Sequence, residues 1–305
     1  MNKIKGLITA PFTPMDEKGE IVFGKIPDYV RLLLKNKVVG AFINGSTGEG
    51  VSLSQKERMQ LTEHWIKAAS GTKELKIINL VGGTSYKESI ENAQHSRECG
   101  VDAIALLAPY YFKPANAGLL AEFCAKVAEA VPDIPFYFYH IPVLSGCYVS
   151  MYDFLQEADS MIPNLAGIKY THEDFMDFQS CLNFMDRKYD MLWGRDENLL
   201  SALVLGARGG VGSTFNYAAP LYYQLIDAFD NGDLDKARKL QHQSIDMIRL
   251  LGKYGGIATG KAYMRYIGFE CGEFRLPVKN MSDDAYKEFE KDVHDLQMQE
   301  LFSSL

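Results

Sequence analysis

Short apolar segments recur along the chain at intervals of roughly 25 to 35 residues, and stretches with a helical pattern separate them. The segments are rich in β-branched and aromatic residues, which are typical of buried strands. There are eight of them, at residues 6–12, 38–44, 76–82, 102–108, 134–140, 165–170, 189–194 and 209–214. Eight strands that alternate with helices predict a (β/α)8 TIM barrel, although a doubly wound open sheet would give a similar pattern with fewer units.

The helical pattern is clearest after the second apolar segment and after the eighth. Ser54 and Glu57 form the sequence signature of a capping box, so the loop at residues 44–50 is expected to connect a strand to a helix. Helical periodicity continues beyond the last strand, through residues 222–251 and 283–302. We therefore predict a (β/α)8 barrel over residues 1–230 and a helical extension over residues 231–305 that packs on it.

Composition and charge narrow the class of protein. The chain has 305 residues, of which 47% are hydrophobic and 23% are charged, and this balance is typical of a globular protein. The net charge of -7, without a run of Lys and Arg, argues against nucleic acid or an anionic membrane as a partner. Pro11, Pro14 and Asp16 interrupt the first apolar stretch before it reaches the length of a signal peptide or membrane span, so we expect a cytoplasmic protein.

The number and spacing of the cysteines bear on disulfides and metal sites. Five of them are scattered along the chain, and no two form a C-x-x-C pair. An odd number without paired spacing fits reduced thiols better than a disulfide framework or a zinc site. We therefore expect no structural metal.

In a TIM barrel the chemistry lies where the carboxyl ends of the strands converge. Lys169 ends the apolar segment at 165–170, so its ammonium group would lie in the barrel mouth, where burial disfavours the charged form. A lysine whose pKa falls to about 7 to 8 is a nucleophile that can form a Schiff base with a carbonyl group. Its residue type alone also allows a plainer role, in which Lys169 reaches solvent or pairs with Glu173 or Asp174.

Tyr139 ends the segment at 134–140. One interpretation is a buried core aromatic that shares a face with Tyr137. The other is a phenol that exchanges a proton with the substrate, for which a second hydroxyl such as that of Thr47 would have to orient it.

The sequence NGSTGEG at residues 44–50 has a structural and a functional interpretation. It could be only a glycine turn that leads into the helix capped by Ser54. Alternatively, the glycines let the backbone approach a ligand, and the hydroxyls of Ser46 and Thr47 donate to a carboxylate. A phosphate loop is excluded because no lysine follows, and the similar sequence GGIATGKA at 255–262 has Ala262 where such a loop carries a hydroxyl.

Asp196 and Glu197 follow the seventh apolar segment. Both acids could simply begin a helix, with Asp196 as the N-cap. Two carboxylates that face Ser213 across the barrel mouth could also accept hydrogen bonds from a polyhydroxylated substrate tail.

Motifs after five of the strands appear in the order found in one enzyme family. They are GSTGE at 45–49, PYYFKP at 109–114, YHIP at 139–142, GIK at 167–169 and GGVGSTFN at 209–216. Together they resemble the pyruvate-dependent class I aldolases, the family that includes the N-acetylneuraminate lyases and the dihydrodipicolinate synthases. The resemblance runs from about residue 6 to 220, and several motifs in sequence make it specific. It implies a small 2-keto acid as substrate, a covalent lysine imine in place of a cofactor, and a homotetramer.

Matched residue by residue, the resemblance implies roles for the candidates above. Lys169 is the Schiff-base lysine and Tyr139 the proton shuttle. Ser46 and Thr47 hold the carboxylate of the 2-keto acid, and Thr47 also links the hydroxyl relay. Tyr111 of PYYFKP takes the place of a tyrosine that enters the site of the neighbouring subunit.

Two residues favour the N-acetylneuraminate lyase branch. Leu144 stands where the synthases carry an arginine for a second carboxylate, and Ser46 stands where the synthases commonly have threonine. This branch implies reversible cleavage of N-acetylneuraminate, or sialic acid, to N-acetylmannosamine and pyruvate. It also matches five positions to the binding of the sugar carbonyl and tail, namely Thr171, Gly194, Asp196, Glu197 and Ser213.

Arg195 departs from the pattern, because a neutral residue is expected there in many lyases. A cation between Gly194 and Asp196 could pair with a carboxylate and change the preference for the substrate tail. The alternatives are an aldolase or dehydratase for 2-keto-3-deoxy sugar acids, a dihydrodipicolinate synthase, which Leu144 disfavours, and a barrel that binds a keto acid or sugar without catalysis.

Overall fold

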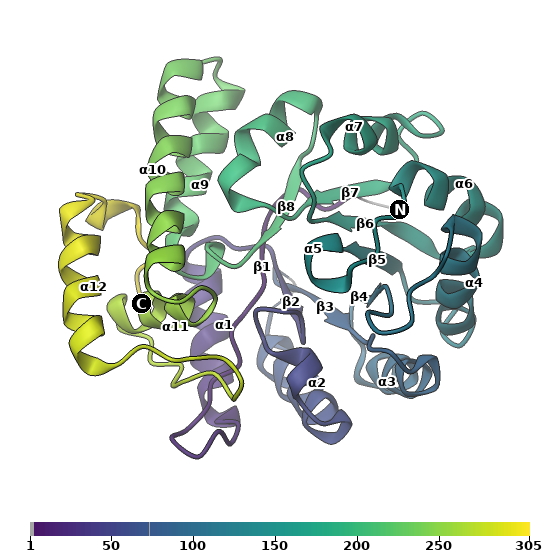
Figure 1. Cartoon of the computed structure of the whole chain (residues 1–305), viewed down its shortest axis with the longest axis horizontal. Helices are drawn as coiled ribbons and strands as arrows, with labels where there is room; N and C mark the ends of the chain where they lie inside the picture. Colours follow the sequence, from purple (N-terminus) through teal and green to yellow (C-terminus); the bar gives the residue numbers. More distant parts are fainter. Residues whose placement is uncertain (1–2, 73) are drawn as a thin grey trace.

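Eight parallel strands close into a barrel in sequence order, and β8 pairs with β1 (Figure 1). The computed structural model describes residues 3–72 and 74–305. The strands are β1 (Gly6–Thr9), β2 (Gly40–Ile43), β3 (Lys76–Leu80), β4 (Ala103–Leu107), β5 (Phe136–His140), β6 (Leu165–Tyr170), β7 (Asp190–Trp193) and β8 (Gly209–Gly212). Each lies within one of the apolar segments, so the TIM barrel prediction is confirmed and the open sheet is wrong.

Helices surround the barrel and connect its strands (Figure 1). Helix α2 begins as predicted, because Ser54 accepts from the backbone N–H of Glu57 and the Glu57 carboxylate accepts from the N–H of Ser54 at 2.8 Å. The helices up to residue 230 are α1 (Ile26–Lys35), α2 (Gln55–Ala69), α3 (Tyr86–Cys99), α4 (Ala117–Ala128), α5 (Pro142–Ser145), α6 (Met151–Met161), α7 (Phe175–Asn183), α8 (Leu199–Leu205) and α9 (Phe215–Asp230).

The strands separate two apolar cores, because successive side chains of a strand point to opposite faces. In β5, Tyr137 and Tyr139 belong to the cluster inside the barrel, whereas Phe136 and Phe138 pack in the larger cluster between the barrel and its helices. The two strands β5 and β6 are paired so that Tyr139 lies beside Lys169. This register places both candidate residues at the same level of the barrel.

Three further helices follow α9 and lie together on one side of the barrel (Figure 1). They are α10 (Leu234–Lys253), α11 (Ala258–Tyr266) and α12 (Asp283–Asp295), and α10 packs along α9. The helical character predicted for residues 231–305 is therefore confirmed. The division of the chain at residue 230 into two units stays a prediction.

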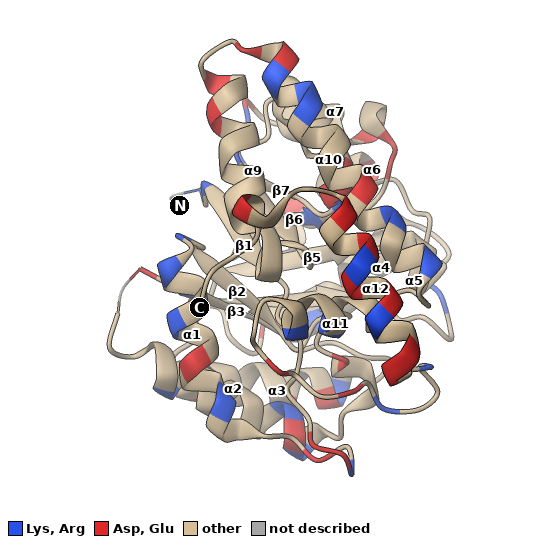
Figure 2. Ribbon diagram, turned by 90° about the vertical axis from the view of Figure 1, so that its left-hand side faces the viewer, with Lys and Arg blue, Asp and Glu red and all other residues tan. Residues whose placement is uncertain are grey.

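The helices of this C-terminal segment carry mixed charges on their outer surface. Figure 2 shows acidic and basic residues interspersed along α12. Even α10, which has 20 residues, contains many charged side chains. Within residues 3–72 and 74–305, no helix combines the length and the apolar character that crossing a membrane requires.

Gly167 in β6 provides a test of how closely the strands pack. A Cβ atom at this position would overlap the backbone carbonyl of Asp190 in β7. We expect Gly167→Ala to lower the free energy of unfolding by about 1–3 kcal/mol, because the barrel backbone would have to move. Thermal and urea unfolding measure this change.

Gly252→Ala is the matched control. No heavy atom lies within 4 Å of the added methyl group, and the residue lies near the end of α10. Alanine has a higher helix propensity than glycine. This variant should therefore keep its free energy of unfolding or raise it by at most about 1 kcal/mol. Equal stability of the two variants would contradict the close packing of β6 against β7.

Candidate active site

A cavity of about 270 Å³ lies at the carboxyl ends of the strands. A larger open hollow of about 780 Å³ lies on the outer surface against α6 and α7, and it contains none of the candidate residues. Three apolar residues from α10 and the segment after it, Ile248, Leu251 and Ile257, complete the cavity wall. The sequence did not identify these three. The predicted residues that line the cavity are Ser46, Thr47, Tyr139, Lys169, Thr171, Gly194, Asp196, Glu197 and Ser213.

Lys169 extends from β6 into the barrel mouth and is only 3% exposed. Its Nζ atom lies 4.1 Å from the centre of the Phe42 ring and 3.9 Å from the centre of the Tyr139 ring. Burial lowers the pKa of the amine to about 7, although the charge of Asp196 opposes this shift. Desolvation of Lys169 is therefore confirmed, and a large fraction of the amine is neutral near pH 7.

The plainer role for Lys169, an ion pair with Glu173 or Asp174, is wrong. Glu173 forms an ion pair with Arg195 instead, with 2.7 Å between Oε1 and Nη2. Asp174 caps α7, where its side chain accepts from the N–H of Asp177 at 3.0 Å. Both acids therefore contact other residues, and Lys169 lies beside the two aromatic rings in the cavity.

Tyr139 is also buried beside Lys169. Burial raises the pKa of its phenol to about 12. The hydroxyls of Ser46 and Thr47 are both candidates for orienting this phenol, and the role given to Thr47 stays a prediction. Both residues line the same cavity, and the direction of each side chain depends on backbone angles that the residue types of a glycine loop do not specify.

Asp196 lines the cavity and is held by Thr214. Its Oδ2 atom accepts from the backbone N–H of Thr214 at 2.9 Å and from the Thr214 hydroxyl at 2.6 Å. Burial raises the pKa of Asp196 to about 6, while these hydrogen bonds and the charge of Lys169 limit the rise. The interpretation of Asp196 as an N-cap is wrong, because Arg195 takes that position before a short 3-10 helix at Asp196–Asn198.

Gly194 and Thr171 meet at the wall of the cavity. A Cβ atom on Gly194 would overlap the Thr171 hydroxyl, so glycine is the residue that leaves room for this side chain. The Thr171 oxygen is buried and has no hydrogen-bond partner among the described residues. A buried hydroxyl without a partner is costly, and its place on the cavity wall makes it available to a ligand.

The loop at residues 44–50 is tied to the C-terminal segment through Glu49. This residue has a left-handed backbone conformation, with φ of 59°, and it lies below the surface. Its Oε1 atom lies 3.0 Å from Nζ of Lys261 in α11, and its Oε2 atom accepts from the N–H of Arg275 at 2.8 Å. Glu49 therefore anchors the loop to two partners that lie more than 200 residues away in sequence.

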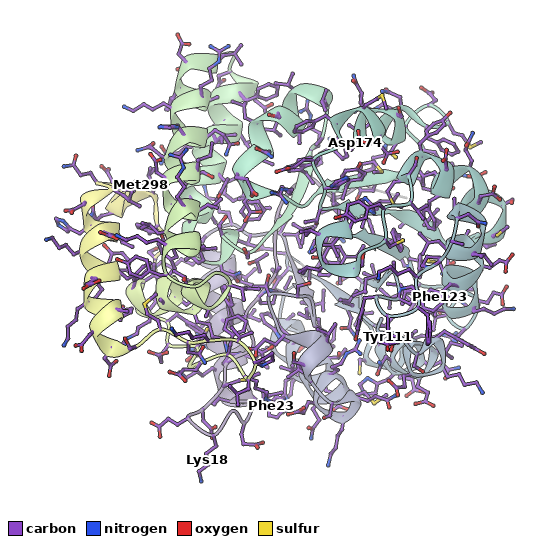
Figure 3. The ribbon with its side chains drawn as sticks, in the orientation of Figure 1. Lys18, Phe23, Tyr111, Phe123, Asp174 and Met298 are labelled. Atoms are coloured by element: carbon purple, nitrogen blue, oxygen red, sulfur yellow. The ribbon has the colours of Figure 1, made fainter. Side chains whose placement is uncertain are left out.

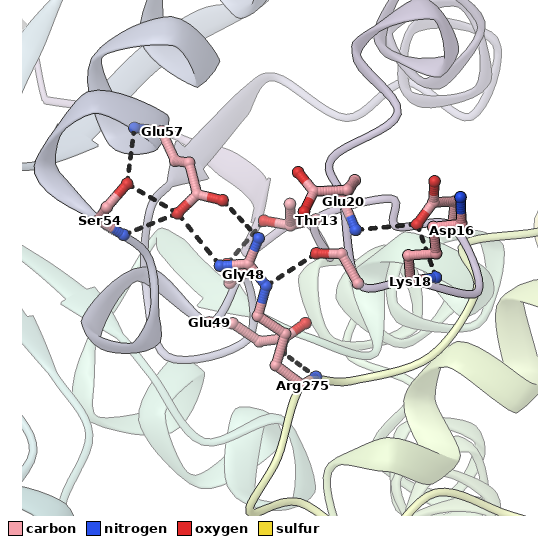
Figure 4. Close-up of polar contacts among 10 residues, drawn as sticks. Thr13, Asp16, Lys18, Glu20, Gly48, Glu49, Ser54, Glu57 and Arg275 are labelled. Atoms are coloured by element: carbon pink, nitrogen blue, oxygen red, sulfur yellow. Dashed lines mark hydrogen bonds and ion pairs between the residues drawn. The ribbon is translucent and has the colours of Figure 1, made fainter.

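Arg275 extends the same connection to the start of α2 (Figure 4). Its guanidinium group binds both carboxylate oxygens of Glu57, and Glu57 in turn accepts from Ser54. This contact lowers the pKa of Glu57 to about 2. On the other side of the loop, the Thr13 hydroxyl donates to the carbonyl of Gly48 at 2.6 Å (Figure 4). The loop that carries Ser46 and Thr47 is therefore held at Glu49 by the C-terminal segment and at Gly48 by Thr13.

Tyr111 stands apart from the other predicted site residues. It lies on the loop between β4 and α4 (Figure 3) and is 77% exposed. Its ring packs edge-on against Phe112, which is exposed as well. Tyr111 does not line the cavity of its own chain, and its predicted role in a neighbouring subunit stays a prediction.

The cysteines agree with the expectation of reduced thiols. All five are free, and four of them are buried. The fifth, Cys99, lies near His95 on the outer surface, and burial raises the pKa of its thiol. Among the described residues, no group of three or more His, Cys, Asp or Glu side chains is arranged to hold a metal ion.

The buried ion pair between Lys261 and Glu49 gives a quantitative expectation. Their side chains are 3% and 4% exposed, so Lys261→Met would leave a buried carboxylate without its charge partner. We expect a loss of about 3–5 kcal/mol in the free energy of unfolding. Chemical denaturation of the purified variant measures it.

Lys287→Met serves as the control for this change. Lys287 forms an ion pair with Asp284 at 2.9 Å, but both side chains lie in solvent. Its loss should change stability by no more than about 1 kcal/mol. A Lys261 variant as stable as the control would mean that Glu49 does not depend on this pair.

The chain is similar to named enzymes over most of its length. The chain is 41% identical to the N-acetylneuraminate lyase of Rattus norvegicus over 286 residues, which cover 92% of this chain and 89% of that protein. It is also 41% identical to the N-acetylneuraminate lyase of Homo sapiens over 284 residues, which cover 92% of this chain and 88% of that protein.

Solved structures of N-acetylneuraminate lyases are also similar to this chain. The N-acetylneuraminate lyase of Proteus mirabilis matches with a TM-score of 0.93 and 36% identity, over 97% of this chain and 99% of that chain. The lyase of Aliivibrio salmonicida matches with a TM-score of 0.94 and 36% identity, over 97% of this chain and 98% of that chain. The model of the dihydrodipicolinate synthetase family matches residues 3–296. The chain therefore belongs to the dihydrodipicolinate synthetase family.

Proposed function

We propose that this protein is a Schiff-base aldolase that reversibly cleaves N-acetylneuraminate to N-acetylmannosamine and pyruvate. The observation that carries the proposal is the buried Lys169, whose pKa is lowered to about 7 beside a tyrosine and several hydroxyls. The 41% identity to N-acetylneuraminate lyases selects the substrate among 2-keto acids.

The reaction begins with the neutral amine of Lys169. It attacks the keto carbon of the open-chain sugar acid, and loss of water gives an iminium ion. The bond between C3 and C4 then breaks, and its electrons move toward the iminium nitrogen. This gives an enamine on Lys169 and the aldehyde of N-acetylmannosamine. Protonation of the enamine and hydrolysis release pyruvate and the free amine, so the proposed reaction needs no cofactor.

Tyr139 is placed to take the proton from the C4 hydroxyl when the bond breaks. Its pKa is about 12, so the phenol is protonated at neutral pH before the imine forms. An iminium ion on Lys169 would add a fixed positive charge close to the ring, since the Lys169 nitrogen lies 3.9 Å from the ring centre. In the proposed reaction the phenol gives its proton to the hydroxyl that leaves as water when the iminium ion forms, and the nearby cation stabilises the phenolate that remains. This phenolate then accepts the proton of the C4 hydroxyl.

The two ends of the substrate would bind on opposite sides of Lys169. The hydroxyls of Ser46 and Thr47 are proposed to hold the carboxylate, in the loop anchored by Glu49. The tail would face Glu197 and Ser213, and carboxylate oxygens suit its hydroxyl groups because they accept several hydrogen bonds at once.

Three neighbouring residues are proposed to complete the tail site. Asp196 uses Oδ2 for Thr214, so Oδ1 is the oxygen that would remain for the substrate. Thr171 offers its unpartnered hydroxyl, and Gly194 leaves the room for it.

We also propose a homotetramer in the cytoplasm. The exposure of Tyr111, together with its place in the loop after β4, supports a role in the site of an adjacent subunit. The free cysteines are compatible with a reducing compartment. Analytical ultracentrifugation would test the assembly directly.

The proposed function is tested by release of pyruvate from N-acetylneuraminate. We expect the purified protein to release it, as followed by coupled reduction with lactate dehydrogenase, and Lys169→Ala to abolish the release. A panel with 2-keto-3-deoxygluconate separates the related aldolases, and activity on that acid alone would replace the proposed substrate. Binding without release for every acid would indicate a barrel that only binds its ligand.

The imine is tested by trapping with pyruvate and cyanoborohydride, followed by peptide mass analysis. Because the pKa of Lys169 is about 7, the amine is protonated below this pH and neutral above it. The rate of trapping should therefore rise as the pH passes through about 7 and then level off. An adduct elsewhere, or a rise only near the pKa of an ordinary lysine, would contradict the role of Lys169.

Tyr139→Phe is the matched variant for this experiment, because it keeps the ring and removes only the hydroxyl. It should still form the adduct, while turnover falls by roughly 10²–10⁴-fold, as expected for loss of a general acid–base group.

A further inference from the structure

Arg195 and Lys169 are the two cations among the described residues that line the active-site cavity. The Nη2 atom of Arg195 lies 2.7 Å from Oε1 of Glu173 and 2.8 Å from Oε1 of Glu197. One nitrogen thus contacts two carboxylates, that of Glu173 after β6 and that of Glu197 after β7. The backbone of Arg195 is fixed as well, because Nε1 of Trp193 donates to its carbonyl at 2.6 Å.

Three acids lie close to this one cation. Asp196 is buried, and the negative charge of Glu197 acts on it. Glu197 itself is 30% exposed, so its side chain has access to water. Without Arg195, repulsion from Asp196 and Glu173 would favour conformations in which Glu197 turns away into solvent. The ion pair therefore keeps the Glu197 carboxylate at the cavity wall.

The ion pair with Arg195 is made through one of the two carboxylate oxygens of Glu197, namely Oε1. An arginine pairs most strongly with a carboxylate when two of its nitrogens contact both oxygens. Here the contact is made by Nη2 to Oε1, and the buried Nε has no acceptor among the described residues. Among the described residues no hydrogen bond to Oε2 of Glu197 is formed, so this oxygen can accept from a ligand.

We propose that Arg195 is a positioning residue that holds Glu197 for the hydroxyl groups of the substrate tail. Through Glu197 it sets the preference for 2-keto acids with a long polyhydroxylated tail over short 2-keto acids. This inference rests on the proposed function. Because the pair lies at the rim and Arg195 does not contact Lys169, the effect falls on substrate binding and spares the chemistry at the amine.

The experiment compares N-acetylneuraminate with a 4-hydroxy-2-keto acid that lacks the polyol tail. Arg195→Met removes the charge and keeps much of the length of the side chain. It should raise KM for N-acetylneuraminate roughly tenfold, the effect of weakening a charge-assisted hydrogen bond, while kcat stays nearly constant. KM for the short acid should not change. Arg195→Lys should recover part of the loss, because it restores the charge without the planar guanidinium group.

Two further variants separate positioning from a general structural effect. Glu173→Gln removes the outer partner of Arg195 and leaves the pair with Glu197, so KM should change little. If Arg195 acts through Glu197, then the double variant Arg195→Met/Glu197→Gln should be no worse than Glu197→Gln alone. Additive losses in the double variant, or an equal rise in KM for the long and short acids, would overturn the proposal.

The wild-type protein keeps this test distinct from the test of the proposed function. If wild type releases no pyruvate from N-acetylneuraminate, the proposed function fails. The same variants are then compared on the longest and shortest 2-keto acids that wild type cleaves, and loss of the length dependence in Arg195→Met remains the expected result. If wild type cleaves no 2-keto acid at all, both proposals are overturned.

Discussion

The removal of Lys169 from water is the constraint on which the site depends. A shift of its pKa from 10.5 to about 7 corresponds to a cost on the order of 5 kcal/mol for the charged form. The barrel can impose this cost because its interior is closely packed, with the rings of Phe42 and Tyr139 around the amine. The same packing places Tyr139 at the level of Lys169 through the pairing of β5 with β6. The low pKa of Lys169 and the position of Tyr139 beside it thus arise from one feature of the fold.

The C-terminal helices are part of this arrangement. Glu49 takes a left-handed conformation in the loop that carries Ser46, and its carboxylate is held by Lys261 from α11 and by the backbone of Arg275. A buried pair of this kind gains little net stability over apolar packing, but it fixes where the loop must lie. Side chains of α10 also close the cavity. The extension therefore shapes the site even though the barrel supplies the candidate catalytic groups.

The sequence predicted the barrel well because its strands are buried on both faces and appear as apolar runs, and the capping box of α2 depends only on neighbouring residues. It identified Lys169 and Tyr139 because each ends such a run. The partner of Glu49 could not be predicted, since Lys261 is 212 positions away and its own motif resembles a phosphate loop that it does not form. Which of the Ser46 and Thr47 hydroxyls orients Tyr139 could not be predicted either, because glycine loops allow several side-chain directions.

The two adjacent acids after β7 point in different directions and have different partners. Asp196 is directed inward, where Thr214 holds it and its pKa is raised to about 6. At neutral pH it is therefore mostly ionised, while Lys169 is partly neutral. When Lys169 becomes an iminium ion it carries a charge that no proton can remove, and the nearby Asp196 carboxylate favours that charge. Glu197 is directed outward to Arg195 instead. In the proposed reaction, the inner acid therefore favours the charge on the lysine, and the outer acid helps to select the substrate.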